Sequence, residues 1–132
     1  MQITVLKYGY SRAVDSGFDA TLARTKKILQ EQGFGVQAEI SLSNALKEKL
    51  GVEVPRQTIL GVCNPQLAYK ALQAEPDISL LLPCNVTVRE SGSQVEVSII
   101  DAGKMMQFVD NPDLKPVADE ANRRLQTALA GI

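Results

Sequence analysis

The sequence contains no histidine and no tryptophan, and it has only two cysteines and few aromatic residues. Histidine is the commonest general base near neutral pH and the commonest metal ligand in proteins. Its absence excludes Ser-His-Asp and Cys-His catalysis, and it also excludes zinc or iron sites built on imidazole.

The chain also lacks an excess of charge and a long apolar run. A formal net charge of -1 gives no positive field to attract nucleic acid or an anionic membrane. No apolar run approaches the roughly 18 residues that a membrane span needs, and the N-terminal stretch alternates like a strand rather than a signal peptide. We therefore expect a cytoplasmic protein without a nucleic-acid or membrane partner, whose cysteines stay reduced.

The size and composition are those of one globular domain, which we expect to cover residues 1–132. Hydrophobic periodicity predicts strands, with an interruption at Pro83, at residues 2–8, 34–42, 58–63, 78–90 and 94–101. It predicts helices, two of them long, at residues 18–32, 44–50, 65–75 and 113–130. The residues expected to face the core from the long helices are Phe18, Leu22, Thr25, Ile28 and Leu29 in the first, and Leu114, Val117, Ala121, Leu125 and Leu129 in the last. In the strand over 34–42, Phe34, Val36, Ala38, Ile40 and Leu42 are expected to share the core face, and Ser91-Gly92-Ser93 is the expected turn of a hairpin. Ser16 and Ser43 are the expected caps of the first two helices, and residues 102–111 are expected to form a loop. The fold class is α+β, a mostly antiparallel sheet with the two long helices on one face.

The least ordinary feature is a pair of Cys-Asn corners. Cys63-Asn64 ends one strand, and Pro65 in the next position favours the start of a helix. Cys84-Asn85 follows Pro83 at a break in the next strand, and twenty residues separate the two cysteines. A short helix joining two strands of the same sheet can bring the two corners together, although the spacing matches no Cys-x-x-Cys or common zinc motif.

Each residue at the corners has two interpretations. The dipole of the following helix favours a thiolate at Cys63, but free cysteines are also among the most often buried residues. Asn64 is an expected helix cap that needs no further role, whereas Asn85 either satisfies amide groups freed by Pro83 or points at a ligand. Tyr69 is either an ordinary half-buried aromatic residue or a hydrogen-bond donor into a nearby cavity.

The segment after the last strand is the second unusual feature, because apolar side chains are uncommon in a loop. Met105, Met106 and Phe108 there indicate a subunit contact or a flap over a pocket. Together with Cys63 and Cys84, the two methionines would also provide a set of soft sulfur ligands suited to copper(I). Asp101, at the end of an apolar strand, is the one carboxylate that we single out.

Several motifs, in their order and spacing, resemble the prokaryotic domain of unknown function 302 family. They are Gly33-Phe34-Gly35-Val36, Leu46-Lys47-Glu48-Lys49-Leu50-Gly51, Gly61-Val62-Cys63-Asn64-Pro65 and Leu80-Leu81-Leu82-Pro83-Cys84-Asn85. The resemblance covers nearly the whole chain. It implies a TATA-binding-protein-like fold, strand-helix-four strands-helix, with short helical inserts, and a homodimer. The family motif maps onto Cys63, Asn64, Pro65, Cys84 and Asn85, but the family has no settled activity.

Three hypotheses about function follow. The first is a non-catalytic, homodimeric domain that holds a small molecule in a pocket lined by Cys63, Asn64, Tyr69, Cys84 and Asn85. The second is a thiol-redox or soft-metal (copper) protein that uses Cys63 and Cys84, with Met105 and Met106 as further candidate ligands. The third is a structural or partner-binding dimer with inert cysteines. The sequence identifies no cofactor.

Overall fold

The computed structural model describes residues 2–132, and its centre is a six-stranded antiparallel sheet. The strands lie in the order β1-β2-β6-β5-β4-β3. Their bounds are β1 Thr4–Val5, β2 Gly9–Val14, β3 Gly35–Ser41, β4 Gln57–Cys63, β5 Cys84–Ser91 and β6 Gln94–Ile100. The predicted α+β class with a mostly antiparallel sheet is confirmed.

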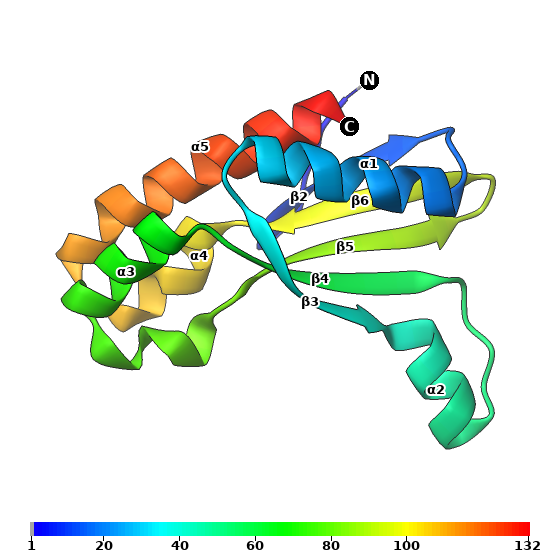
Figure 1. Ribbon diagram of the computed structural model, residues 1–132, viewed down its shortest axis with the longest axis horizontal. Helices are drawn as coiled ribbons and strands as arrows, with labels where there is room; N and C mark the ends of the chain where they lie inside the picture. The colour runs from blue at the N-terminus through cyan, green and yellow to red at the C-terminus, as the bar shows by residue number, and fades with distance from the viewer. Residues whose placement is uncertain (1) are drawn as a thin grey trace.

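The helices divide into two long ones and several short ones. Their bounds are α1 Phe18–Glu31, α2 Leu42–Leu50, α3 Pro65–Ala74, α4 Ala102–Met106 and α5 Lys115–Gly131. Three 3-10 helices complete the set: η1 Pro76–Leu81, η2 Gln107–Val109 and η3 Pro112–Leu114. The long helices α1 and α5 lie together over the sheet, whereas α2 lies beyond the β3 edge (Figure 1). Among residues 2–132, no helix combines the length and the hydropathy that a membrane span requires.

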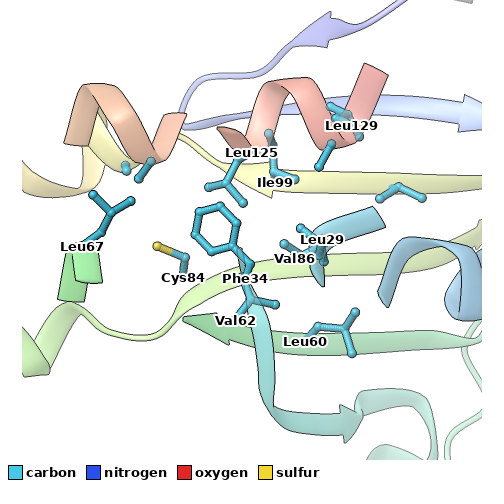
Figure 2. Close-up of a cluster of buried hydrophobic side chains, with 14 of the residues drawn as sticks. Leu29, Phe34, Leu60, Val62, Leu67, Cys84, Val86, Ile99, Leu125 and Leu129 are labelled. Carbon is cyan, nitrogen blue, oxygen red and sulfur yellow. The ribbon is translucent and has the colours of Figure 1, made fainter. Parts of the chain in front are cut away.

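The core lies between the sheet and the two long helices. Buried and exposed residues alternate along the strands, most clearly in β5. Cys84, Val86 and Val88 are buried there, whereas Asn85 and Arg89 are exposed. This alternation gives the sheet one covered face and one open face. The ring of Phe34 lies at the centre of the core (Figure 2). Its neighbours in the cluster include Leu29, Leu60, Val62, Val86, Ile99, Leu125 and Leu129.

Both long helices follow their predicted stripes closely. In α5, all five predicted inward residues are buried: Leu114 (just before it in η3), Val117, Ala121, Leu125 and Leu129. In α1, Phe18, Thr25 and Leu29 are buried as predicted, but Thr21 rather than Leu22 completes the buried set. Ser16 does not cap α1, because Gly17 occupies the cap position without a side-chain hydrogen bond.

The predicted strand over residues 2–8 is largely wrong. Only Thr4–Val5 is strand there, and the main N-terminal strand is β2, Gly9–Val14, which pairs with β6. The alternation of β2 is hard to recognise in the sequence, because Arg12 occupies a position opposite the buried Val97 where an apolar residue is expected. Arg12 Nη1 donates to the carbonyls of Leu129 and Ala130 at the end of α5, where the helix dipole favours a cation, while Arg12 Nε is buried without a partner among the described residues.

Strand β3 lies where it was predicted, but its two faces differ from the prediction. A register shift between Val36 and Ala38 interrupts the pairing with β4. Beyond this irregularity Ile40, which was expected to face the core, is 51% exposed. An irregularity of this kind re-aims the following side chains, so the alternation of the sequence no longer matches the buried face.

Three short segments also differ from the prediction. Residues 78–82 are not strand as predicted, because residues 78–81 belong to the 3-10 helix η1, and β5 begins only at Cys84, after Pro83. Residues 102–106, expected to be loop, form α4, because the Asp101 side chain accepts a hydrogen bond from the Lys104 amide and caps the helix. Ser41 rather than Ser43 caps α2. The TATA-binding-protein likeness stays a prediction.

Candidate functional site

The two corners lie at the same end of the sheet because β4 and β5 are paired neighbours. Val62 pairs with Cys84, so Cys63 is one residue beyond the pair and alternation places it on the other face of the sheet. Gly61 allows the corners to approach, since a Cβ on Gly61 would lie 2.7 Å from Cγ of Pro83. The ring of Pro83 therefore rests on β4 where β4 has no side chain.

Asn64 is the most tightly fixed polar residue of the corner. Its Oδ1 accepts a hydrogen bond of 3.0 Å from the Leu67 amide, which caps α3 as the Asn64-Pro65 pair predicts. Asn64 is only 7% exposed. This burial is unusual, because asparagine is mostly an exposed residue and capping a helix does not require burial. The cap thus holds an amide side chain inside the corner rather than on the surface.

A small cavity lies between the two corners, with a volume of about 30 Å³. Its wall includes Cys63, Asn64 and Cys84 from the predicted site, and Met106 from the predicted sulfur set. Apolar residues form the rest of the wall, from Phe34, Val62 of β4, α3, the Leu82-Pro83 segment and α5. A space of this volume holds about one water-sized group.

The remaining predicted residues lie away from this cavity. Asn85 is exposed on the open face of the sheet, and Tyr69 is 64% exposed on the outside of α3. Met105 is half-buried and does not line the cavity, although its neighbour Met106 does. Phe108 is exposed. The structure thus brings together four of these eight residues: Cys63, Asn64, Cys84 and Met106.

The two thiols differ in their surroundings. Burial raises the pKa of Cys84 to about 11, and a charge on the nearby Cys63 would raise it further. The Cys84 thiol, which points toward Leu67 in Figure 2, is therefore protonated at neutral pH. Cys63 is half-buried, so it is the more accessible thiol. Among residues 2–132, no cluster of three or more Cys, Asp or Glu side chains has the geometry to hold a metal ion.

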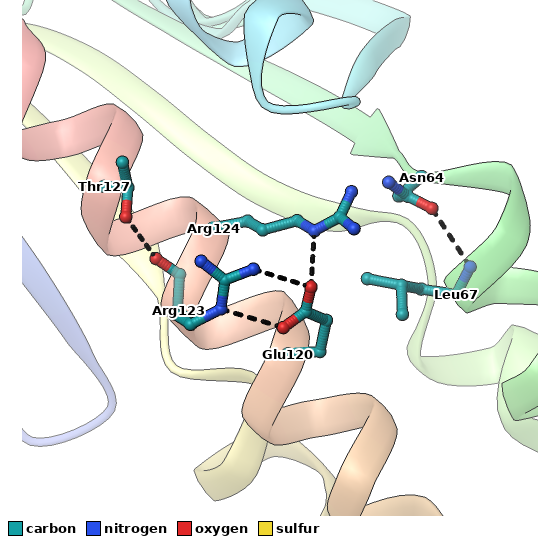
Figure 3. Close-up of polar contacts among 6 residues, drawn as sticks. All are labelled: Asn64, Leu67, Glu120, Arg123, Arg124 and Thr127. Carbon is teal, nitrogen blue, oxygen red and sulfur yellow. Dashed lines mark hydrogen bonds and ion pairs between the residues drawn. The ribbon is translucent and has the colours of Figure 1, made fainter.

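A polar group that the sequence reading did not include borders the corner. Arg124 and Arg123 of α5 both donate to Glu120, and they lower the pKa of this carboxyl to about 2 (Figure 3). Arg124 also approaches Gly33 and Asn64, since a Cβ on Gly33 would lie 3.1 Å from Arg124 Nη1 and 2.7 Å from Asn64 Nδ2. The i,i+4 spacing of Glu120 and Arg124 was visible in the sequence, but their proximity to Asn64 was not.

A larger cleft of about 600 Å³ lies between α4 and the start of α5. Asp101 belongs to its wall and accepts hydrogen bonds from Tyr10, Asn122 and the Lys104 amide. Burial alone would raise the pKa of Asp101, but the hydrogen bonds outweigh it and hold that pKa below its usual range. Asp101 is thus a structural cap whose lone pairs are in use. Met106 is the one residue that borders both this cleft and the small cavity.

Comparison with known proteins identifies the family. The family model for the domain of unknown function DUF302 matches residues 10–132. A crystal structure of an uncharacterized conserved DUF302 protein from Bacillus stearothermophilus is similar to the chain, with a TM-score of 0.88 and 28% sequence identity over 95% of this chain and 98% of that one. No curated protein matches. The chain therefore belongs to the DUF302 family, as its Cys-Asn motifs indicated.

Proposed function

We propose that this protein is a non-catalytic, homodimeric ligand-binding domain whose ligand binds at the Cys63-Asn64 and Cys84 corner. The observation that carries the proposal is the convergence of these residues, from segments twenty residues apart, on one small cavity. Small-molecule sites have this composition, a mostly apolar wall with few polar groups. The 30 Å³ volume admits only the tip of a ligand, so the body of the ligand lies over the surface around Asn64.

The chemistry of the corner supports binding rather than catalysis. Its wall carries no ionisable group other than the two thiols. A thiol is a nucleophile only as thiolate, and the Cys84 thiol is protonated at neutral pH. No carboxylate in the wall of the cavity is available to accept a proton from Cys63.

One apolar surface, on and beside α2, supports the homodimer. Helix α2 has no buried residue, although an isolated helix of nine residues is marginal in water. Exposed apolar side chains lie on and beside it: Ile40, Leu50, Val52 and Val54. A second copy that covered this surface would stabilise α2 by burying these side chains. In native mass spectrometry we expect the mass of two chains, and a monomer at micromolar concentration would contradict this part of the proposal.

Ligand binding is tested by native mass spectrometry of protein purified under reducing conditions. We expect a retained small molecule whose mass adds to that of the protein. The variant Ala68→Leu fills the wall of the corner from α3 and is expected to lose the adduct. Gln73→Leu, an exposed position on the same helix, is the matched control and is expected to keep it. An adduct that both variants retain would place the ligand elsewhere.

A soft-metal site is the second candidate function, and one observation favours it. Cys84 and Met106 line the same cavity, and Cys63 borders it, although alternation places the Cys63 side chain on the other face of the sheet. Titration of the reduced protein with copper(I) tests this function. Met106→Leu is expected to weaken copper binding, while Met105→Leu is the control that leaves it unchanged. Equal effects of the two substitutions, or no binding by the wild type, would contradict the soft-metal function.

A further inference from the structure

Two hydrogen-bond donors, one neutral and one charged, lie close to Gly33 at the corner. Asn64 Nδ2 and Arg124 Nη1 both lie within about 3 Å of the point where Gly33 would carry a Cβ. The structure shows no acceptor for either nitrogen among residues 2–132. We infer that Asn64 and Arg124 form a recognition pair for an anionic oxygen, so that the ligand carries an oxyanion such as a carboxylate or phosphate. This inference rests on the proposed function, because it names the chemical class of the ligand at the same corner.

The orientation of the Asn64 amide is fixed by the fold. Because its Oδ1 accepts the capping hydrogen bond from the Leu67 amide, its Nδ2 must point the other way, toward Gly33. The side chain is more than nine-tenths buried. Nδ2 itself is not fully buried, because Arg12 Nε is the one buried side-chain nitrogen or oxygen without a partner among the described residues. An incoming acceptor can therefore reach Nδ2 and replace water there.

Arg124 is oriented in the same manner by Glu120. Its Nε donates to Glu120 Oε2 over 2.8 Å, which turns the outer guanidinium nitrogens toward the corner (Figure 3). Arg123 binds the same carboxylate through two hydrogen bonds but points away from the corner. Two guanidinium groups therefore share one carboxylate, and this cluster keeps a surplus of one positive charge.

Gly33 provides the space in which the two donors meet. It ends α1 with φ at +85°, a conformation that glycine adopts readily, and any side chain would collide with Asn64 Nδ2. A charged donor beside a neutral donor favours an anionic acceptor, because charge-assisted hydrogen bonds are about twice as strong as neutral ones. Asn64 also lines the sulfur-bordered cavity, so the geometry fits a ligand with an apolar tip and an oxyanion head.

The inference is tested by NMR with sodium acetate and sodium phosphate as probes at constant ionic strength. We expect saturable shifts of the Asn64 side-chain amide and the Arg124 guanidinium signals, and stronger shifts with the preferred oxyanion. Asn64→Asp keeps the cap on α3 but replaces the donor by an acceptor, and Arg124→Gln removes the charge. Each is expected to weaken probe binding at least about tenfold. Arg123→Gln, which changes the same charge one residue away, is expected to stay within about twofold.

Two results would overturn the inference: shifts that do not saturate, or equal losses in Arg124→Gln and Arg123→Gln. Far-UV circular dichroism of each variant checks that it is folded. If Arg124→Gln does not fold, the comparison of Asn64→Asp with the wild type still tests the inference. A neutral probe, acetamide, separates this inference from the proposed function. Saturable shifts of the Leu67 and Cys63 amides with acetamide alone would leave a ligand site without oxyanion recognition. Shifts with none of the probes, together with no retained small molecule, would contradict both.

Discussion

Replacing Gly33 with alanine is expected to destabilise the protein by more than backbone strain alone. A non-glycine residue in the left-handed region costs about 1–2 kcal/mol, partly offset by about 0.4–1 kcal/mol from the stiffer unfolded chain. The new Cβ would lie 2.7 Å from Asn64 Nδ2, which the capping bond to α3 prevents from moving freely. Displacing that cap adds about 1 kcal/mol, so we expect a total loss of about 2 kcal/mol.

Gly51 provides the matched control for this prediction. It also has a positive φ, +68°, and also ends a helix, but no atom lies within 4 Å of its added Cβ. Gly51→Ala therefore reports strain alone, and we expect a loss of about 1 kcal/mol or less. Urea denaturation followed by circular dichroism gives both free energies of unfolding. Equal losses in the two variants, within about 0.3 kcal/mol, would refute the close packing of Gly33 and Asn64.

Three further predictions concern the thiols and the core. Burial raises the pKa of Cys84 from 9.0 to about 11, so the folded protein favours the protonated thiol. The stability that this thiol contributes is complete below pH 9 and is lost as the pH rises toward 11. Across that interval the free energy of unfolding of the wild type should fall by up to about 2–3 kcal/mol more than that of Cys84→Ala. Iodoacetamide at pH 8 should alkylate Cys63 and leave Cys84 unmodified in the folded protein. Alkylated Cys84 in the mass spectra of the peptides would contradict this prediction. Leu125→Ala should lower the free energy of unfolding by about 2–5 kcal/mol, whereas Leu80→Ala, at a position 86% exposed, should change it by less than about 0.5 kcal/mol; similar losses would place the core elsewhere.

The sequence alone is sufficient to predict an element where its hydrophobic periodicity agrees with the residues that start or stop helices and turns. The stripe of α5 and the Asn64-Pro65 helix start are determined by neighbouring residues, and both were predicted correctly. The hairpin between β5 and β6 was also predicted, because Gly92 adopts the positive φ that its turn requires. These features need no knowledge of the rest of the chain.

The errors arose where distant contacts override the local pattern. Arg12 belongs to β2 because its guanidinium reaches the end of α5, more than a hundred residues away in the sequence. The register shift in β3 depends on its pairing with β4 and cannot be read from alternation. For the same reason the sequence indicated the two cysteines and Asn64 but not Arg124 or Glu120, which reach the corner only because α5 packs beside α3.

The most direct test of the oxyanion site is a high-resolution crystal structure of the protein soaked in sodium acetate. We expect an acetate oxygen within hydrogen-bond distance of both Asn64 Nδ2 and Arg124 Nη1, beside Gly33, with the Leu67 cap intact. Asn64 Nδ2 bonded to an acceptor of the protein itself, or Arg124 turned away from Gly33, would contradict it.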